Sequence, residues 1–212
     1  MNRISIYIIS FVIIASAYLT AQDSEALKLL KDGNNRFVNG KLLFKDFKGD
    51  RTKLTNSQSP YAIVVTCSDS RVPVEYIFDE SLGKLFVIRN AGNVLDKIEL
   101  GSIEYAATQL NSKTLIIMGH KSCGAVKAKL AATKLPSKNL NAIVDKIILP
   151  KDSDKLHKSI DLDEAIKFNV NNQIDYLKKN SQILNKLIIS KQLEIVGAIY
   201  DIESGKVEFI NE

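Results

Sequence analysis

The chain has no basic stripe, although its 212 residues carry a formal net charge of +5. Its longest basic cluster is the pair Lys178-Lys179, and the other lysines are spread through the chain among Asp and Glu. A nucleic-acid-binding protein more often shows clustered Lys and Arg with interleaved aromatic residues. The charge pattern is instead typical of a solvated surface, and we expect no nucleic-acid partner.

The sequence also lacks internal repeats, low-complexity tracts and an interdomain linker. Its composition, 45% hydrophobic and 25% charged, is that of an ordinary globular protein. Length and composition together predict one domain with a sizeable core over residues 22–212.

The N-terminal segment has the features of a secretory signal peptide. Arg3 gives it a positive start, Ile4 to Ala17 is an apolar run broken only by Ser and Tyr, and Ala21 precedes polar residues. The run is short for a membrane span of about 20 residues, which disfavours the alternative of a retained anchor. No cysteine follows it, which disfavours a lipoprotein. We expect residues 1–21 to be cleaved near Ala21, leaving an exported, periplasmic protein without stable membrane association.

Hydrophobic patterning predicts an α/β fold. Short apolar, β-branched runs alternate with segments of helical periodicity, as in βαβ units with right-handed crossovers. The expected strands are 61–66, 85–89, 115–118, 194–200 and 206–210, and the expected helices are 26–38, 98–110, 123–135, 142–148 and 161–189. This order predicts a mainly parallel central sheet of about four to five strands flanked by helices.

Two short motifs follow two of the predicted strands. Cys67, Asp69 and Arg71 come after strand 61–66, and His120 and Cys123 come after strand 115–118. The carboxyl ends of parallel strands form one edge of a sheet, so the motifs are expected to meet. Two thiolates, one imidazole and one carboxylate make a suitable tetrahedral zinc set.

The same residues allow other arrangements. Cys67 and Cys123, the only cysteines, can form a disulfide in an exported protein. That bond would leave His120, Asp69 and Arg71 without a shared purpose, and we favour a metal. Asp69 can be held by zinc, which closes the site, or by Arg71, which opens the fourth position to water. A zinc-binding protein without turnover is a further alternative.

Three blocks of the sequence resemble the β-class carbonic anhydrases. They run from Cys67 to Pro73, from Phe86 to Asn93 and from Gly119 to Gly124. Residues 33–37 and 196–201 are similar to the ends of the same family, and the resemblance spans roughly residues 25–210.

The resemblance implies zinc-dependent, reversible hydration of carbon dioxide to bicarbonate and a proton, by a zinc-bound hydroxide. The family's zinc ligands, one ion per subunit, fall on Cys67, His120 and Cys123. The Asp-Arg dyad falls on Asp69 and Arg71, with Asp69 as the fourth ligand in a closed state.

The family also lines its substrate pocket from a dimer partner, which implies a homodimer or a tetramer. By position the pocket residues are Gln58, Phe86 and Tyr105. Their ordinary interpretations are a loop amide, a strand core residue and an aromatic on a helix face. Val72 and Gly124, with Phe86, are expected as apolar walls for carbon dioxide.

One departure from the family pattern bears on whether Asp69 binds zinc or pairs with Arg71. Some members carry an inhibitory bicarbonate pocket that needs Trp three residues, and Gly one residue, before the first zinc cysteine. Those positions are Val64 and Thr66 here, and the chain has no Trp. We therefore expect Asp69 to be paired with Arg71. The nearest rival activity is hydrolysis of a carbon dioxide analogue, carbonyl sulfide or carbon disulfide, on the same scaffold.

Overall fold

The computed structural model describes residues 24–43, 45–132, 134–150 and 160–210. The predicted signal peptide, residues 1–21, lies outside these ranges, as does His157, and the export prediction stays a prediction. Among the described residues, no helix combines the length and apolar character needed to cross a membrane.

The centre of the molecule is a five-stranded sheet that is parallel except at one edge. Its order is β2 (Leu85–Asn90), β1 (Ala62–Cys67), β3 (Thr114–His120), β4 (Glu194–Tyr200) and β5 (Val207–Ile210), with only β5 antiparallel. The β1 and β3 residues are buried throughout, as expected of inner strands covered on both faces. The predicted α/β fold with a mainly parallel sheet is confirmed.

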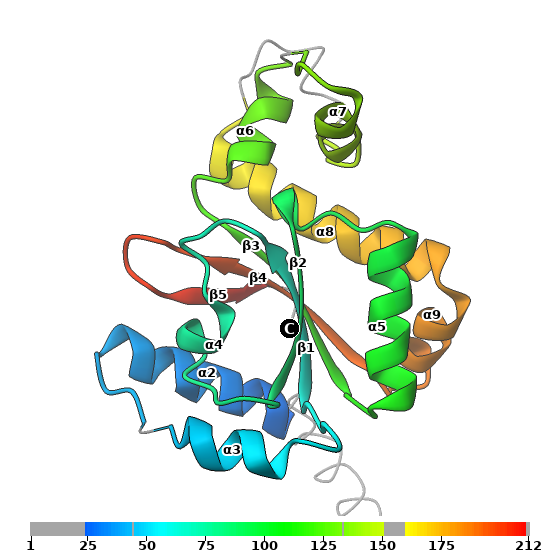
Figure 1. Cartoon of the computed structure of the whole chain (residues 1–212). Coiled ribbons are helices and arrows are strands. Elements are labelled where there is room, and N and C mark those ends of the chain that lie inside the picture. Colours follow the sequence, from blue (N-terminus) through cyan, green and yellow to red (C-terminus); the bar gives the residue numbers. More distant parts are fainter. Residues whose placement is uncertain (1–23, 44, 133, 151–159, 211–212) are drawn as a thin grey trace, which may run out of the picture.

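Helices cover both faces of the sheet (Figure 1). One face carries α2 (Glu25–Val38), α3 (Phe47–Lys53) and α4 (Val74–Ile77), and the other carries α5 (Lys97–Gln109), α8 (Leu162–Asn180) and α9 (Gln182–Ile189). Two short helices, α6 (Gly124–Leu130) and α7 (Lys138–Asp145), follow β3, and a 3-10 turn, η2 (Ala91–Asn93), follows β2.

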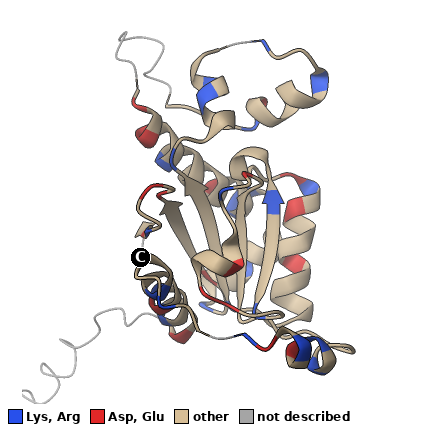
Figure 2. Ribbon diagram, turned by 60° about the vertical axis from the view of Figure 1, so that its left-hand side comes forward, with Lys and Arg blue, Asp and Glu red and all other residues tan. Residues whose placement is uncertain are grey.

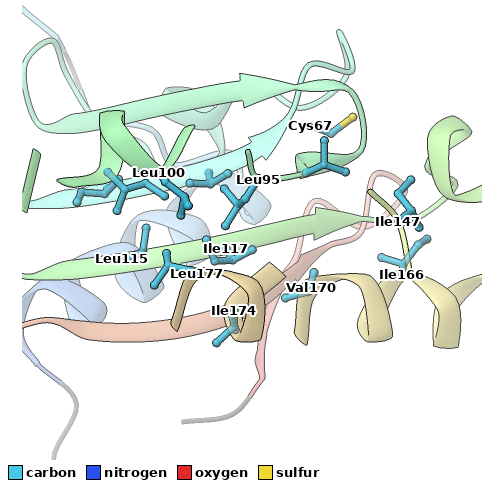
Figure 3. Packing of buried hydrophobic residues seen from close by; sticks show 14 of the residues in the cluster. Cys67, Leu95, Leu100, Leu115, Ile117, Ile147, Ile166, Val170, Ile174 and Leu177 are labelled. Carbon is cyan, nitrogen blue, oxygen red and sulfur yellow. The ribbon is translucent and has the colours of Figure 1, made fainter. Parts of the chain in front are cut away.

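Alternating strand residues build two cores, one on each face of the sheet. Ile63, Val65 and Ile117 pack with the apolar residues of α5, α8 and α9. Val64 and Met118, which point the other way, pack with α2 and α4. Figure 3 shows the first core, in which Ile166, Val170, Ile174 and Leu177 of α8 face the sheet and Cys67 lies at one end.

The glycine in the middle of α2 marks a close contact between elements. A Cβ at Gly33 would lie 1.9 Å from the carbonyl oxygen of Phe78, so only glycine allows this approach. The next residue, Asn34, is buried and donates to the carbonyls of Ile77 and Gly205, while the amide of Val207 donates to its side-chain oxygen. The polar stretch that weakens the helical pattern of the sequence therefore ties α2 to α4 and to the β4–β5 turn.

Several helix boundaries differ from the sequence prediction, because capping side chains fix where the helices begin and end. The helix expected at 142–148 spans 138–145, where the Ser137 side chain accepts from the amide of Leu140. The long segment 161–189 is two helices, because Ser181 ends α8 and caps α9. The helix expected at 123–135 ends at Leu130, and α4 and η2 have too few residues for a periodic signal.

Charged side chains lie mainly on the helices and loops. Figure 2 shows Lys and Arg interleaved with Asp and Glu over these elements, while the strands are mostly free of charge colour. This mixture matches the solvated surface expected from the sequence.

Two alanine substitutions test the close approach at Gly33. Gly33→Ala should lower the free energy of unfolding by about 2 kcal/mol, because the new methyl group collides with backbone rather than with a side chain. Gly101→Ala in α5, where a Cβ meets nothing within 4 Å, should raise it by about 0.5–1 kcal/mol. Urea unfolding of the two variants and the wild type provides the measurement. Equal effects at both positions would contradict the packing of α2 against α4.

Candidate metal centre

The ends of two neighbouring strands bring the predicted metal ligands together. Cys67 is the last residue of β1, His120 is the last residue of β3, and the two strands pair in parallel. Ser122 has a φ of +59°, a left-handed turn that lets the chain reverse before Cys123 at the start of α6. The ligand atoms of the two cysteines and the histidine all lie within 4.8 Å of one another.

The burial and hydrogen bonding of these residues fit a bound metal. Cys67, His120 and Cys123 are all buried, and both cysteines are free thiols. His120 Nδ1 lies 2.8 Å from the carbonyl oxygen of Lys121, so Nδ1 carries the proton and Nε2 carries the lone pair. Nε2 is buried without a hydrogen-bond partner in the described chain, an orphan that a metal ion would satisfy.

The two thiols share one hydrogen bond, and this separates their acidities. The hydrogen bond from Cys123, together with that from the Gly92 amide, outweighs burial and lowers the pKa of Cys67 to about 4. The same hydrogen bond and burial raise the pKa of Cys123 above its usual range. The Gly92 nitrogen lies 3.3 Å from Cys67 Sγ. The lowered pKa of Cys67 favours its thiolate, the form of cysteine that binds a metal.

Asp69 forms its hydrogen bonds with Arg71 rather than with the two thiols. Arg71 Nε lies 2.9 Å from Asp69 Oδ1, Arg71 Nη2 lies 2.8 Å from Oδ2, and the Arg71 amide donates to Oδ1 at 2.9 Å. The Arg71 hydrogen bond holds the pKa of Asp69 well below its usual range. Asp69 Oδ2 still lies only 3.9 Å from His120 Nε2, so the carboxylate borders the candidate ligand set.

Other residues that shape the site were not predicted. Arg89, at the end of β2, donates to the carbonyl of Asp69 at 2.8 Å and to that of Cys67 at 3.3 Å, which fixes the loop after β1. Two signals in the sequence pointed to Arg89: it is a charge in an otherwise apolar strand, and it lies in the block from Phe86 to Asn93. Gly92, which lies in the block from Phe86 to Asn93, and the buried Asn169 also reach the site, and nothing in the sequence around Asn169 distinguished it.

The predicted pocket residues from the amino-terminal part of the domain lie away from the metal ligands of the same chain. Phe86 pairs with Ile63, four residues before Cys67, which places it about 13 Å along the strands from that ligand. Tyr105 of α5 is half-exposed, and its ring centroid lies 6.3 Å from that of Phe86. Gln58 is exposed and precedes β1. One chain therefore gathers these residues near the opposite edge of the sheet.

The other two wall residues differ in exposure. Val72 is fully buried in the core between the sheet and α2, so its side chain offers no surface within one chain. Gly124 follows Cys123, is exposed, and faces open space where a Cβ would be.

Comparison with known proteins gives one consistent result. A family profile described as carbonic anhydrase matches residues 62–207. Carbonic anhydrase 2 of Mycobacterium tuberculosis is 39% identical over 188 residues, covering 85% of this chain and 89% of that protein. The carbonic anhydrase of Mycolicibacterium smegmatis is 40% identical over 190 residues, covering 86% and 91%.

Solved structures of similar fold agree. The β-carbonic anhydrase CcaA superposes with a TM-score of 0.68 at 27% identity, covering 87% of this chain and 95% of that chain. The β-carbonic anhydrase of Coccomyxa in complex with acetazolamide gives a TM-score of 0.68 at 26% identity, covering 91% and 88%.

Thiol counting tests the candidate centre. Denatured protein, prepared without reductant, should show two reactive thiols, because both cysteines are free. Cadmium added to the native chain should protect both thiols and produce a sulfur-to-metal charge-transfer band, and His120→Ala should weaken the protection by removing the imidazole ligand. No reactive thiols in the denatured chain would instead establish the disulfide.

Proposed function

Since the chain belongs to the β-class carbonic anhydrase family, we propose that it catalyses the reversible hydration of carbon dioxide to bicarbonate and a proton. One zinc ion per subunit is held by Cys67, His120 and Cys123. The observation that carries the proposal is the placement of three buried ligand atoms within 4.8 Å of one another, bordered by a carboxylate that an arginine holds.

The donor set favours zinc. Two thiolates and a neutral imidazole balance the charge of a divalent ion, and soft sulfur with nitrogen is a ligand combination that zinc prefers. When bound, zinc supplies a Lewis acid that brings the pKa of a water molecule towards neutrality. The carbonyl of Lys121 fixes the tautomer and the ring orientation of His120, which keeps Nε2 directed into the site.

Asp69 and Arg71 keep the fourth ligand position available. Arg71 uses its guanidinium fork and its main-chain amide on one carboxylate, so Asp69 remains ionised and stays out of the ligand set. Oδ1 accepts two of these hydrogen bonds, whereas Oδ2 accepts one and keeps a further lone pair. We assign Asp69 to accept a hydrogen bond from the reacting water and to orient it, with Arg71 as its positioning residue.

The substrate pocket is proposed to be shared between two copies of the chain. Gln58, Phe86 and Tyr105 lie near the sheet edge opposite the metal ligands, so a second copy is needed to bring them to a metal site. Exposed apolar surface supports such assembly, since large exposed patches mark interfaces. One groove of about 310 Å³ includes the exposed side chains of Leu42, Leu43, Phe47, Tyr76 and Leu82. The assembly is a homodimer or a tetramer.

Export remains part of the proposal on the sequence of residues 1–21 alone. The positive start, the apolar run and Ala21 favour a cleaved signal peptide and a periplasmic location. The free thiols of the mature protein are then protected from oxidation by the metal that they bind.

Stopped-flow hydration of carbon dioxide by the zinc-loaded chain tests the activity. The wild type should exceed the zinc-free control at neutral and alkaline pH, and Cys67→Ala should abolish both zinc retention and turnover. Arg71→Lys keeps the charge but loses the fork, so kcat/KM should fall by roughly tenfold or more with zinc still bound. A zinc-loaded wild type with no activity would reject hydration, and assays with carbonyl sulfide and carbon disulfide would then test the rival activity.

Complementation tests the shared pocket. Gln58→Ala and Cys67→Ala should each be inactive alone, while their coexpression should restore about a quarter of wild-type activity, because half the dimers are mixed and each has one intact site. Two copies of Gln58→Ala in the same coexpression provide the control. Failure of the mixed sample to recover, with mixed dimers shown by mass spectrometry, would place the whole pocket within one chain.

A further inference from the structure

Two buried side-chain amides on α8 lie behind the candidate metal centre. Asn169 and Gln173 are 1% and 2% exposed, one helical turn apart. The same face of α8 is otherwise apolar and packs on the sheet (Figure 3). Burying an amide in such a core is costly unless it is hydrogen-bonded, so the partners of these side chains indicate what they are for.

The amides form a chain of hydrogen bonds that ends at Gly92. Gln173 Nε2 donates to Asn169 Oδ1 at 3.1 Å and to the carbonyl of Lys146 at 3.2 Å, and Gln173 Oε1 accepts from the amide of Leu95 at 2.8 Å. Asn169 Nδ2 donates to the carbonyl of Gly92 at 3.0 Å. Gln173 is therefore anchored on the segment after α7 and on the connection between β2 and α5, and Asn169 holds the same connection at Gly92.

Gly92 connects this chain of hydrogen bonds to the metal ligand. Its backbone has φ +76° and ψ +14°, and its N–H donates to Cys67 Sγ at 3.3 Å. A Cβ there would lie 3.0 Å from the Cβ of Ala125, so a side chain is excluded by both conformation and space. Glycine populates several backbone conformations, and the hydrogen bond at its carbonyl selects the one in which the N–H meets the sulfur.

We propose that Asn169, supported by Gln173, is a positioning residue of the metal centre. It holds Gly92 so that the Gly92 N–H donates to Cys67 Sγ, which spreads the charge of the thiolate and orients its remaining lone pairs towards the metal. Hydrogen-bond partners of metal ligands are typically worth about 10–100-fold in metal affinity. The inference rests on the proposed function of Cys67 as a zinc ligand.

The competing explanation is that the amides only stabilise the loop after β2. Asn169→Leu keeps the branching and the number of heavy atoms of the wild-type side chain and lacks the donor to Gly92. Asn180→Leu, at the end of the same helix, is the matched control, because Asn180 is exposed and donates only to the Tyr176 carbonyl one turn earlier. Ala91-Gly92 is the only Ala-Gly step in the chain, so labelling with ¹³C-carbonyl alanine and ¹⁵N-glycine isolates a single amide signal, that of Gly92.

The expected result has two parts. Asn169→Leu should move the Gly92 amide proton upfield and speed its hydrogen exchange by about tenfold, relative to the wild type and to Asn180→Leu. Competition with a chromophoric chelator should show zinc affinity weaker by about tenfold or more. Gln173→Met should act in the same direction with a smaller effect, and it provides the test if Asn169→Leu does not fold.

Unchanged zinc affinity in the folded variants, with only a lowered melting temperature, would overturn the inference in favour of a purely structural role. A wild-type chain that retains no zinc would instead reject the proposed function. In that case the Gly92 signal still decides whether Asn169 holds the amide on Cys67, because both hydrogen bonds join protein atoms only.

Discussion

The parallel pairing of β1 with β3 is the constraint on which the rest of the site depends. The register sets Thr66 opposite Met118, so both strands end at one edge of the sheet and deliver Cys67 and His120 there. Both strands are buried on both faces, and a slip by one residue would move every side chain from one core to the other, where its packing partners differ. The remaining ligand, Cys123, needs only the left-handed turn at Ser122 to come back to the same edge.

A polar site inside an apolar core is stable only if its groups find partners, and most of them do. The carbonyl of Lys121 accepts a hydrogen bond from His120 Nδ1, and the Gly92 amide donates one to Cys67 Sγ. The Arg71 guanidinium donates two to the carboxylate of Asp69. Among the described residues, three buried side-chain atoms have no hydrogen-bond partner, Asn90 Oδ1, Asn93 Nδ2 and His120 Nε2, and of these His120 Nε2 belongs to the candidate ligand set. A buried imidazole lone pair beside two thiols, within a shell of hydrogen-bonded groups, has the features of a metal-binding centre.

The sequence predicted those parts of the structure that depend on local pattern and strand order. Apolar runs located the strands, and their carboxyl ends brought Cys67, Asp69, Arg71, His120 and Cys123 to one place. Contacts between segments far apart in the chain leave no periodic pattern in the sequence, so they could not be predicted from it. Asn169 is an ordinary polar residue in a helix, and only the tertiary structure puts it against Gly92. Gly33 and Asn34 interrupt a helical pattern locally yet join α2 to its neighbours. The position of Gln58, Phe86 and Tyr105 far from the ligands of their own chain likewise depends on the fold, and the function proposed for them requires a second copy.

X-ray absorption at the zinc edge of the mature, zinc-loaded protein tests the central claim most directly, because it reports the atoms around the metal. The account predicts a four-coordinate shell with two sulfur atoms at about 2.3 Å and two nitrogen or oxygen atoms at about 2.0–2.1 Å, the latter being one imidazole and one water. In Cys123→Ser the shell should contain one sulfur atom instead of two, which would identify Cys123 as a zinc ligand. A shell without sulfur, or a six-coordinate oxygen shell, would contradict it.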